Sequence, residues 1–279
     1  MKFISRVSGL LVGMLFLLFS LLPINSATSK TAMDMNQTPQ QPFPYREEAV
    51  TFVSPKAAVT LVGILTLPQG KGPFPAVLIV VGADRNDRDE SFAPDHHPFL
   101  VVADALTRRG IAVLRYDKRG VGESGGNFDA ATTKDFEEDA LNGIEYLKKR
   151  VEIDPRKIGI VGHSEGGMIA CLAAVDSRNV SFIVLMAAIG VPWDEAVLHA
   201  NTEVLRKEGV HKEVVSVLTR VGHAVIEEIR NEKNNAKALD KANEIIKSGK
   251  ESLKEEDWEK YEALCVSLNE TVALHVISV

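Results

Sequence analysis

The feature that most constrains this chain is a serine between two glycines at the end of an apolar run. Residues 158–161 read Ile-Gly-Ile-Val, which suits a buried strand, and the chain continues as Gly162-His163-Ser164-Glu165-Gly166. A run of small residues follows with helical spacing. A strand that turns straight into a helix leaves little room, so the residues flanking the serine must lack bulk. We therefore predict a sharp strand–turn–helix, with Ser164 projecting above the strand.

A turn of this kind can support nucleophilic chemistry. The N-terminus of the following helix offers free N–H groups and the positive end of the helix dipole, and both stabilise an oxyanion. We predict Ser164 as the nucleophile and the N–H of Glu165 as one oxyanion donor. His163 is adjacent to the nucleophile in sequence and cannot easily face it as a base, so we expect it to pack beside the turn.

A second oxyanion donor is expected from the loop Gly82-Ala83-Asp84. This loop follows the continuous apolar run 76–81, which reads as a strand buried on both faces. In strand–turn–helix folds with a nucleophilic serine, the corresponding loop supplies an N–H to the oxyanion. Ala83 is the expected donor; the alternative is that Gly82 only turns the chain.

Strand and helix patterns alternate over much of the chain. Apolar and β-branched runs predict strands, helical spacing predicts helices, and the two alternate from residue 49 to residue 187. This alternation predicts an α/β protein with a doubly wound, mostly parallel sheet and helices on both faces. The expected strands are 49–53, 59–67, 76–81, 111–116, 157–161 and 180–187, and the expected helices are 99–109, 133–150 and 166–175.

The ends of the chain differ from this core. Lys2 and Arg6 precede an almost entirely apolar run that ends at Pro23, the layout of a secretory signal peptide. We predict a signal peptide over 1–27, cleaved near Ser26 to Ser29, with an uncleaved membrane anchor as the alternative. The mature protein is then expected outside the cytoplasm, without stable membrane association.

Three further segments are expected after the signal peptide. Residues 28–45 are rich in Thr, Gln, Asn and Pro and read as a linker. Residues 46–192 hold the alternating core. Residues 193–279 carry charged helical sequence without a convincing strand, and we predict an incomplete cap of two to four helices.

Composition and cysteines narrow the choice of function. The chain is 45% hydrophobic and 25% charged, which is typical of a globular protein, and its net charge is −6 without a basic cluster. Nucleic acid is therefore not an expected partner. An exported protein could join Cys171 and Cys265, but Cys171 falls on the helix after Ser164, where a small buried residue is expected. We favour two free, buried thiols.

A group of acidic residues and histidines could suggest a metal. His96 and His97 follow Asp84, Asp87, Asp89 and Asp95. The glycine and the terminal bidentate glutamate of an EF-hand loop are missing, so that register does not fit. We expect no metal and no cofactor.

A resemblance to a known family comes from three motifs. Asp117-Lys118-Arg119-Gly120-Val121-Gly122-Glu123-Ser124 resembles the Asp-x-Arg-Gly-x-Gly-x-Ser loop of α/β-hydrolases. Together with the Ser164 turn and Asn86-Asp87-Arg88-Asp89, it resembles a bacterial esterase branch related to serine aminopeptidases and similar to proline iminopeptidases. The resemblance covers about 50–192.

The resemblance implies an α/β-hydrolase fold in which a helical cap interrupts the sheet. It also implies a serine hydrolase that cleaves carboxylic esters of small molecules through an acyl-enzyme, without a cofactor. Amides or short peptides are the alternative substrates, and a catalytically dead fold that binds a ligand is a further alternative. We interpret Asp117, Arg119 and Ser124 as a structural loop that shapes the pocket floor.

The acid and the histidine of a catalytic triad are not found at the positions where the family has them. Chain order in this fold is Ser, then Asp or Glu, then His, with the acid after a strand that follows the cap. We expect that the sequence is truncated and that its last strands are missing, which would leave strand 180–187 as an uncovered edge. The alternative is a rewired triad with Asp194 as the acid and His223 or His275 as the base.

Overall fold

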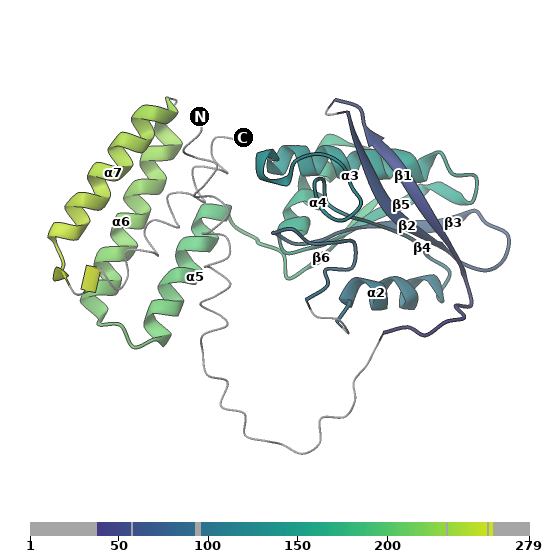
Figure 1. The fold of residues 1–279 in the computed structure, drawn as a ribbon, viewed down its shortest axis with the longest axis horizontal. Helices are drawn as coiled ribbons and strands as arrows, with labels where there is room; N and C mark the ends of the chain where they lie inside the picture. Colours follow the sequence, from purple (N-terminus) through teal and green to yellow (C-terminus); the bar gives the residue numbers. More distant parts are fainter. Residues whose placement is uncertain (1–37, 57, 93–95, 233, 256, 259–279) are drawn as a thin grey trace, which may run out of the picture. The chain divides into compact units, whose positions relative to one another are not determined.

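The computed structural model describes residues 38–258, apart from 57, 93–95, 233 and 256. The predicted signal peptide, Cys265 and His275 therefore lie outside the described residues. The described chain forms two compact units, one ending at Ile189 and the other beginning at Gly190 (Figure 1). Each unit is described by itself below.

The first unit is built on a six-stranded sheet with the order β1-β2-β4-β3-β5-β6. The pairs β1–β2 and β2–β4 are antiparallel, whereas the pairs β4–β3, β3–β5 and β5–β6 are parallel. The prediction of a mostly parallel sheet is confirmed. The strands are β1 (Arg46–Ser54), β2 (Val59–Leu67), β3 (Phe74–Val80), β4 (Ala112–Tyr116), β5 (Ile153–His163) and β6 (Phe182–Met186).

Helices cover both faces of this sheet, as Figure 1 shows. They are α2 (Pro98–Thr107), α3 (Thr133–Lys148) and α4 (Glu165–Asp176), with a short 3-10 turn, η2, at Phe128–Ala130. Alternate side chains of β3 point to opposite sides. Val77 and Ile79 pack in one apolar cluster with Phe99 of α2, whereas Leu78 packs in another with Ile144 of α3. A strand buried on both faces explains the unbroken apolar run.

The second unit is helical where the structure describes it. Its described residues form α5 (Trp193–Lys207), α6 (Lys212–Asn231) and α7 (Asn235–Glu251). Val221 and Val225 of α6 pack with Val197 of α5 and Ala242 of α7, so an amphipathic face of each helix closes a small core. Among the described residues, no helix combines the length and the apolar character needed to cross a membrane.

Two details of the first unit differ from expectation. Cys171 is free but exposed, so the prediction that it is buried is wrong. Ile169, Ala170 and Ala173 form the buried face of α4, and the helical repeat places Cys171 on the opposite side. At the other end, Tyr45 is buried and its hydroxyl donates to Asp104 over 2.9 Å, so packing against the core begins within the segment expected to be a linker.

Strand β6 forms one edge of the described sheet. Its apolar side chains are partly open to solvent: Phe182 is 42% exposed, Val184 45% and Leu185 48%. An edge strand with exposed apolar side chains favours association with other chains.

The core of the sheet generates a prediction for stability. Leu78 is fully buried between β4, β5 and α3, so Leu78→Ala should lower the free energy of unfolding by about 2–5 kcal/mol. Leu172→Ala is the matched control because Leu172 is 38% exposed, and it should change stability by less than about 1 kcal/mol. Denaturant unfolding followed by far-ultraviolet circular dichroism measures both. Equal losses in the two variants would contradict this description of the core.

Candidate active site

The site begins at the junction of β5 and α4. β5 ends at His163, α4 begins at Glu165, and Ser164 between them has φ 52° and ψ −117°. A residue with a Cβ rarely adopts a positive φ, and such strain persists only where the surrounding structure imposes it. The Ser164 N–H donates to the carbonyl of Met186 on β6, and its own carbonyl accepts from Gly167, both over 3.0 Å. The predicted strand–turn–helix is confirmed.

Close backbone packing explains the two glycines that flank this turn. A Cβ on Gly162 would lie 2.2 Å from the carbonyl oxygen of Gly166, and a Cβ on Gly166 would lie 2.1 Å from that of Val80. Neither contact is possible for a real side chain, and both involve backbone that cannot swing away. The first turn of α4 therefore rests directly on β5 and on the end of β3, which holds Ser164 at the carboxyl edge of the sheet.

The loop after β3 lies against Ser164. A Cβ built on Gly82 would lie 3.4 Å from the Cβ of Ser164 and 3.2 Å from Nδ1 of His163. This places the predicted oxyanion loop beside the predicted nucleophile. Asp84 continues the loop with φ 70°, and the side-chain amide of Asn86 donates to the carbonyl of Ala83. The path of the loop is thus fixed by internal contacts.

Burial shapes the electrostatics of this loop. Desolvation raises the pKa of the Asp84 carboxyl above its ordinary value; nearby Lys118 acts in the opposite direction and Glu165 adds to the rise. Lys118 and Glu165 are 4% and 5% exposed, and their side chains form an ion pair of 3.0 Å. A buried pair like this one was not predicted, although Lys118 lies within the motif that carries the family resemblance.

His163 packs beside the turn, as expected. Its Nδ1 lies 2.9 Å from Oε1 of Glu90, and its ring stacks at a tilt 5.9 Å from Phe99. Glu90 is 3% exposed, and its backbone adopts a positive φ of 51°. The ring of His163 is therefore oriented by a buried carboxylate on a strained backbone. Sequence reasoning missed Glu90, because nothing near it in the chain indicates that it meets residues 73 positions away.

The side chains of the loop from Asp117 to Ser124 are held by hydrogen bonds within the loop and to its neighbours, and its predicted place at a pocket floor stays a prediction. Asp117 accepts three hydrogen bonds from Arg88, and the Ser124 hydroxyl donates to the carbonyl of Asp117 over 2.7 Å. Burial alone would raise the pKa of Asp117, but the hydrogen bonds from Arg88 and from the Glu123 N–H hold it below its ordinary value.

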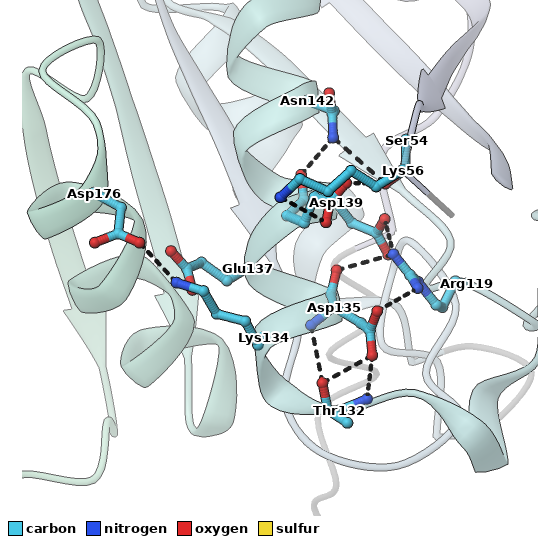
Figure 2. Close-up of polar contacts among 11 residues, drawn as sticks. Ser54, Lys56, Arg119, Thr132, Lys134, Asp135, Glu137, Asp139, Asn142 and Asp176 are labelled. Carbon is cyan, nitrogen blue, oxygen red and sulfur yellow. Dashed lines mark hydrogen bonds and ion pairs between the residues drawn. The ribbon is translucent and has the colours of Figure 1, made fainter. Parts of the chain in front are cut away.

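Arg119 extends this loop toward α3. Figure 2 shows its guanidinium between Asp139, which it binds through two nitrogens at 2.6 and 2.8 Å, and Asp135 at 2.9 Å. Asp135 also completes a capping box with Thr132 at the start of α3. Nearby, Lys134 links α3 to α4 through Asp176 over 2.7 Å. These side chains form hydrogen bonds and ion pairs with one another, so we assign them a structural role and not a catalytic one.

The residues proposed for a rewired triad make other contacts in the described part of the second unit, and the rewired triad stays a prediction. Asp194, near the start of α5, is paired with Arg230 over 2.8 Å, and His223 of α6 is exposed. The other proposed base, His275, lies outside the described residues. The acidic loop residues weighed as metal ligands are also engaged: Asp89 pairs with Arg115, and Asp87 accepts the N–H groups of Asp89 and Ser91.

Comparison with known proteins identifies the family. The family model of the X-Pro dipeptidyl-peptidases (S15 family) matches residues 58–267, well over half of the chain. The chain therefore belongs to this family. The predicted membership of the α/β-hydrolase superfamily is confirmed.

Two curated relatives are similar over part of their length. Esterase EstD of Thermotoga maritima is 34% identical over 158 residues, which are 57% of this chain and 37% of that protein. Putative hydrolase YtaP of Bacillus subtilis is 30% identical over 124 residues, which are 39% of this chain and 42% of that protein. The chain thus spans less than half the length of these relatives. A solved esterase of Pyrococcus furiosus is 21% identical with a TM-score of 0.47, covering 62% of this chain and 59% of its own.

The strained serine generates a prediction that does not depend on activity. A Cβ at this backbone conformation costs about 1–3 kcal/mol, whereas glycine adds only about 0.4–1 kcal/mol of unfolded-state entropy. Ser164→Gly should therefore be more stable than Ser164→Ala by about 1 kcal/mol. Denaturant titration of the two variants measures the difference. A glycine variant less stable than the alanine variant, as at an ordinary position, would rule out the strained turn.

Proposed function

We propose that the protein hydrolyses carboxylic esters of small molecules through an acyl-enzyme on Ser164. The observation that carries the proposal is the strained backbone of Ser164 at a strand-to-helix turn, with the loop after β3 packed beside it. Strain of this kind concentrates at functional positions, where the surrounding structure maintains it. A serine at such a turn is exposed above the sheet and has helix N–H groups behind it.

The proposed chemistry proceeds in two steps. The Oγ of Ser164 attacks the ester carbonyl carbon, the carbonyl oxygen becomes an oxyanion, and the alcohol leaves with a proton as the acyl group remains on Oγ. Water then adds to the acyl carbonyl and releases the carboxylic acid, which regenerates the serine. The N–H groups of Glu165 and Ala83 are the proposed oxyanion donors. Their dipoles are fixed before the reaction starts, which is the main source of their effect.

The proposed mechanism also needs a general base that accepts the proton of the Ser164 hydroxyl. A serine hydroxyl needs a histidine to accept its proton, and a carboxylate to orient that histidine. In the described part of the sheet unit, the contacts of the histidines involve other groups: His163 meets Glu90, His96 stacks with Phe92, and His97 meets the Ser91 hydroxyl. We infer that the base of the whole protein comes from outside the described residues of this unit.

Peptides are the second class of substrate. The family takes its description from dipeptidyl-peptidases, and amide and ester hydrolysis use the same nucleophile and oxyanion donors. One comparison and one chemical argument favour the ester. The relative with the longest match reported above is described as an esterase, and ester cleavage makes smaller demands on leaving-group protonation. A catalytically dead fold that binds a ligand is the rival from another class.

In the described part of the sheet unit no histidine is positioned as a base for Ser164, and this leads to a prediction about turnover by the 279-residue chain. Without a base the serine is a neutral alcohol, so the rate on short-chain p-nitrophenyl esters should be at most about 10³–10⁴-fold above that in water. Ser164→Ala should change this small rate little, whereas in a relative that contains all triad members it should abolish turnover. An ordinary enzymic rate that His223→Ala or His275→Ala removes would instead assign the base and support the rewired triad.

We also propose export from the cytoplasm, supported by the charged start and apolar run of residues 1–23. Expression in a bacterial host, fractionation and N-terminal sequencing test it. The expected product lies outside the cytoplasm and begins between about Ser26 and Ala32, near the predicted cleavage region. Recovery of a soluble cytoplasmic protein that starts at Met1 would overturn this proposal.

A further inference from the structure

Buried charged side chains hold the main chain of Gly82 on two sides. Its N–H donates to Oε2 of Glu90 over 3.3 Å, and its carbonyl oxygen accepts from Nζ of Lys118 over 3.1 Å. Glu90 is 3% exposed and Lys118 is 4% exposed. Charged groups are rarely buried to this extent unless they are paired, so their placement at one glycine needs an explanation.

The planarity of the peptide group links Lys118 to Ala83. The carbonyl of Gly82 and the N–H of Ala83 belong to one trans peptide unit, in which they point in opposite directions. Fixing the carbonyl toward Lys118 therefore fixes the direction of the Ala83 N–H, away from the ammonium. The next carbonyl, that of Ala83 itself, accepts from the side chain of Asn86, so the loop is held on both sides of this N–H.

The same ammonium reaches the other proposed oxyanion donor. Lys118 donates a second hydrogen bond to Oε2 of Glu165 over 3.0 Å. Glu165 is the residue directly after Ser164 and the first residue of α4. The ammonium also lies 4.2 Å from the ring centroid of Phe136. A lysine has three N–H donors, and this arrangement gives it two oxygen acceptors and an aromatic face.

We propose that Lys118 is a positioning residue that sets the spacing and direction of the two oxyanion donors, the N–H groups of Ala83 and Glu165. Its ammonium binds the carbonyl of the peptide unit that carries the Ala83 N–H. It also binds the side chain of Glu165, the residue whose own N–H is the other donor. It acts through them and makes no contact with substrate. This inference rests on the proposed function, because it assigns those N–H groups to an oxyanion.

The carbonyl of an acyl-enzyme reports directly on this geometry. Hydrogen bonds from the two donors polarise the acyl C=O and lower its stretching frequency. The test acylates Ser164 of the full chain with cinnamoyl imidazole that carries ¹³C at the carbonyl, and isotope-edited infrared spectroscopy reads the C=O band. A slow second step favours the measurement, because the acyl group stays on the serine.

The decisive comparison is Lys118→Met, which keeps the length of the side chain and removes its donors. The expected result is a C=O band at higher frequency than in the wild type, with partial return toward the wild-type frequency in Lys118→Arg. Lys134→Met is the control, because that lysine is 62% exposed and pairs with Glu137 and Asp176 on α3 and α4; its band should not move. If Lys118→Met fails to fold, Lys118→Gln, whose shorter side chain cannot bridge both partners, should show the same upward shift.

The outcomes separate this inference from the proposed function. An acylated Ser164 whose C=O band is the same in the wild type and the lysine variants would overturn the positioning role and leave the nucleophile intact. A loss of thermal stability in Lys118→Met without a band shift would likewise show that the ion pair is only structural. Failure to acylate Ser164 in the wild type, even on prolonged incubation with this activated reagent, would count against the nucleophile itself.

Discussion

The close approach of backbone to backbone beneath Ser164 is the constraint on which the rest of the site depends. The missing side chains of Gly162 and Gly166 allow the first turn of α4 to touch β5 and the end of β3. No flexible side chain separates these elements, so the direction of the chain between them is strongly limited. Ser164 accordingly adopts a positive φ, and the residue after it starts a helix. The loop after β3 meets the serine because both strands end at the same edge of a parallel sheet.

Three successive residues after β4 then tie this edge to the surrounding elements. Asp117 binds Arg88 in the loop before α2, Lys118 binds Glu165 at the start of α4, and Arg119 binds Asp139 on α3. Each of the three is at most 5% exposed. Removal of one partner from a buried pair typically destabilises a protein by about 3–5 kcal/mol, since a charge is left without compensation. The loop therefore combines structural support with control over the direction of backbone groups near the serine.

The sequence predicted the parts of the molecule that depend on local patterns. Apolar runs predicted the strands, and the glycines around Ser164 predicted a turn that no bulky residue could make. Prediction from the sequence failed where burial or hydrogen bonding depends on residues far away in the chain. Cys171 was expected to be buried because it falls on the helix after Ser164, where a small buried residue is expected, yet the face of a helix that meets a sheet depends on the whole packing arrangement. Glu90 lies 8 positions from Gly82 and 73 from His163, so only the folded chain reveals that it binds both.

The role of Ser164 as the nucleophile is tested most directly by covalent labelling. A fluorophosphonate carries a strongly activated leaving group, so on prolonged incubation it also tests an exposed serine at an oxyanion site whose base is not in place. The phosphorus–oxygen bond that forms survives digestion and mass spectrometry. The account predicts that the label on the full chain is found on the peptide that contains Ser164, that it is absent from Ser164→Ala, and that Ser181→Ala retains it. Label found mainly on another residue, or an unchanged extent of labelling in Ser164→Ala, would contradict the account.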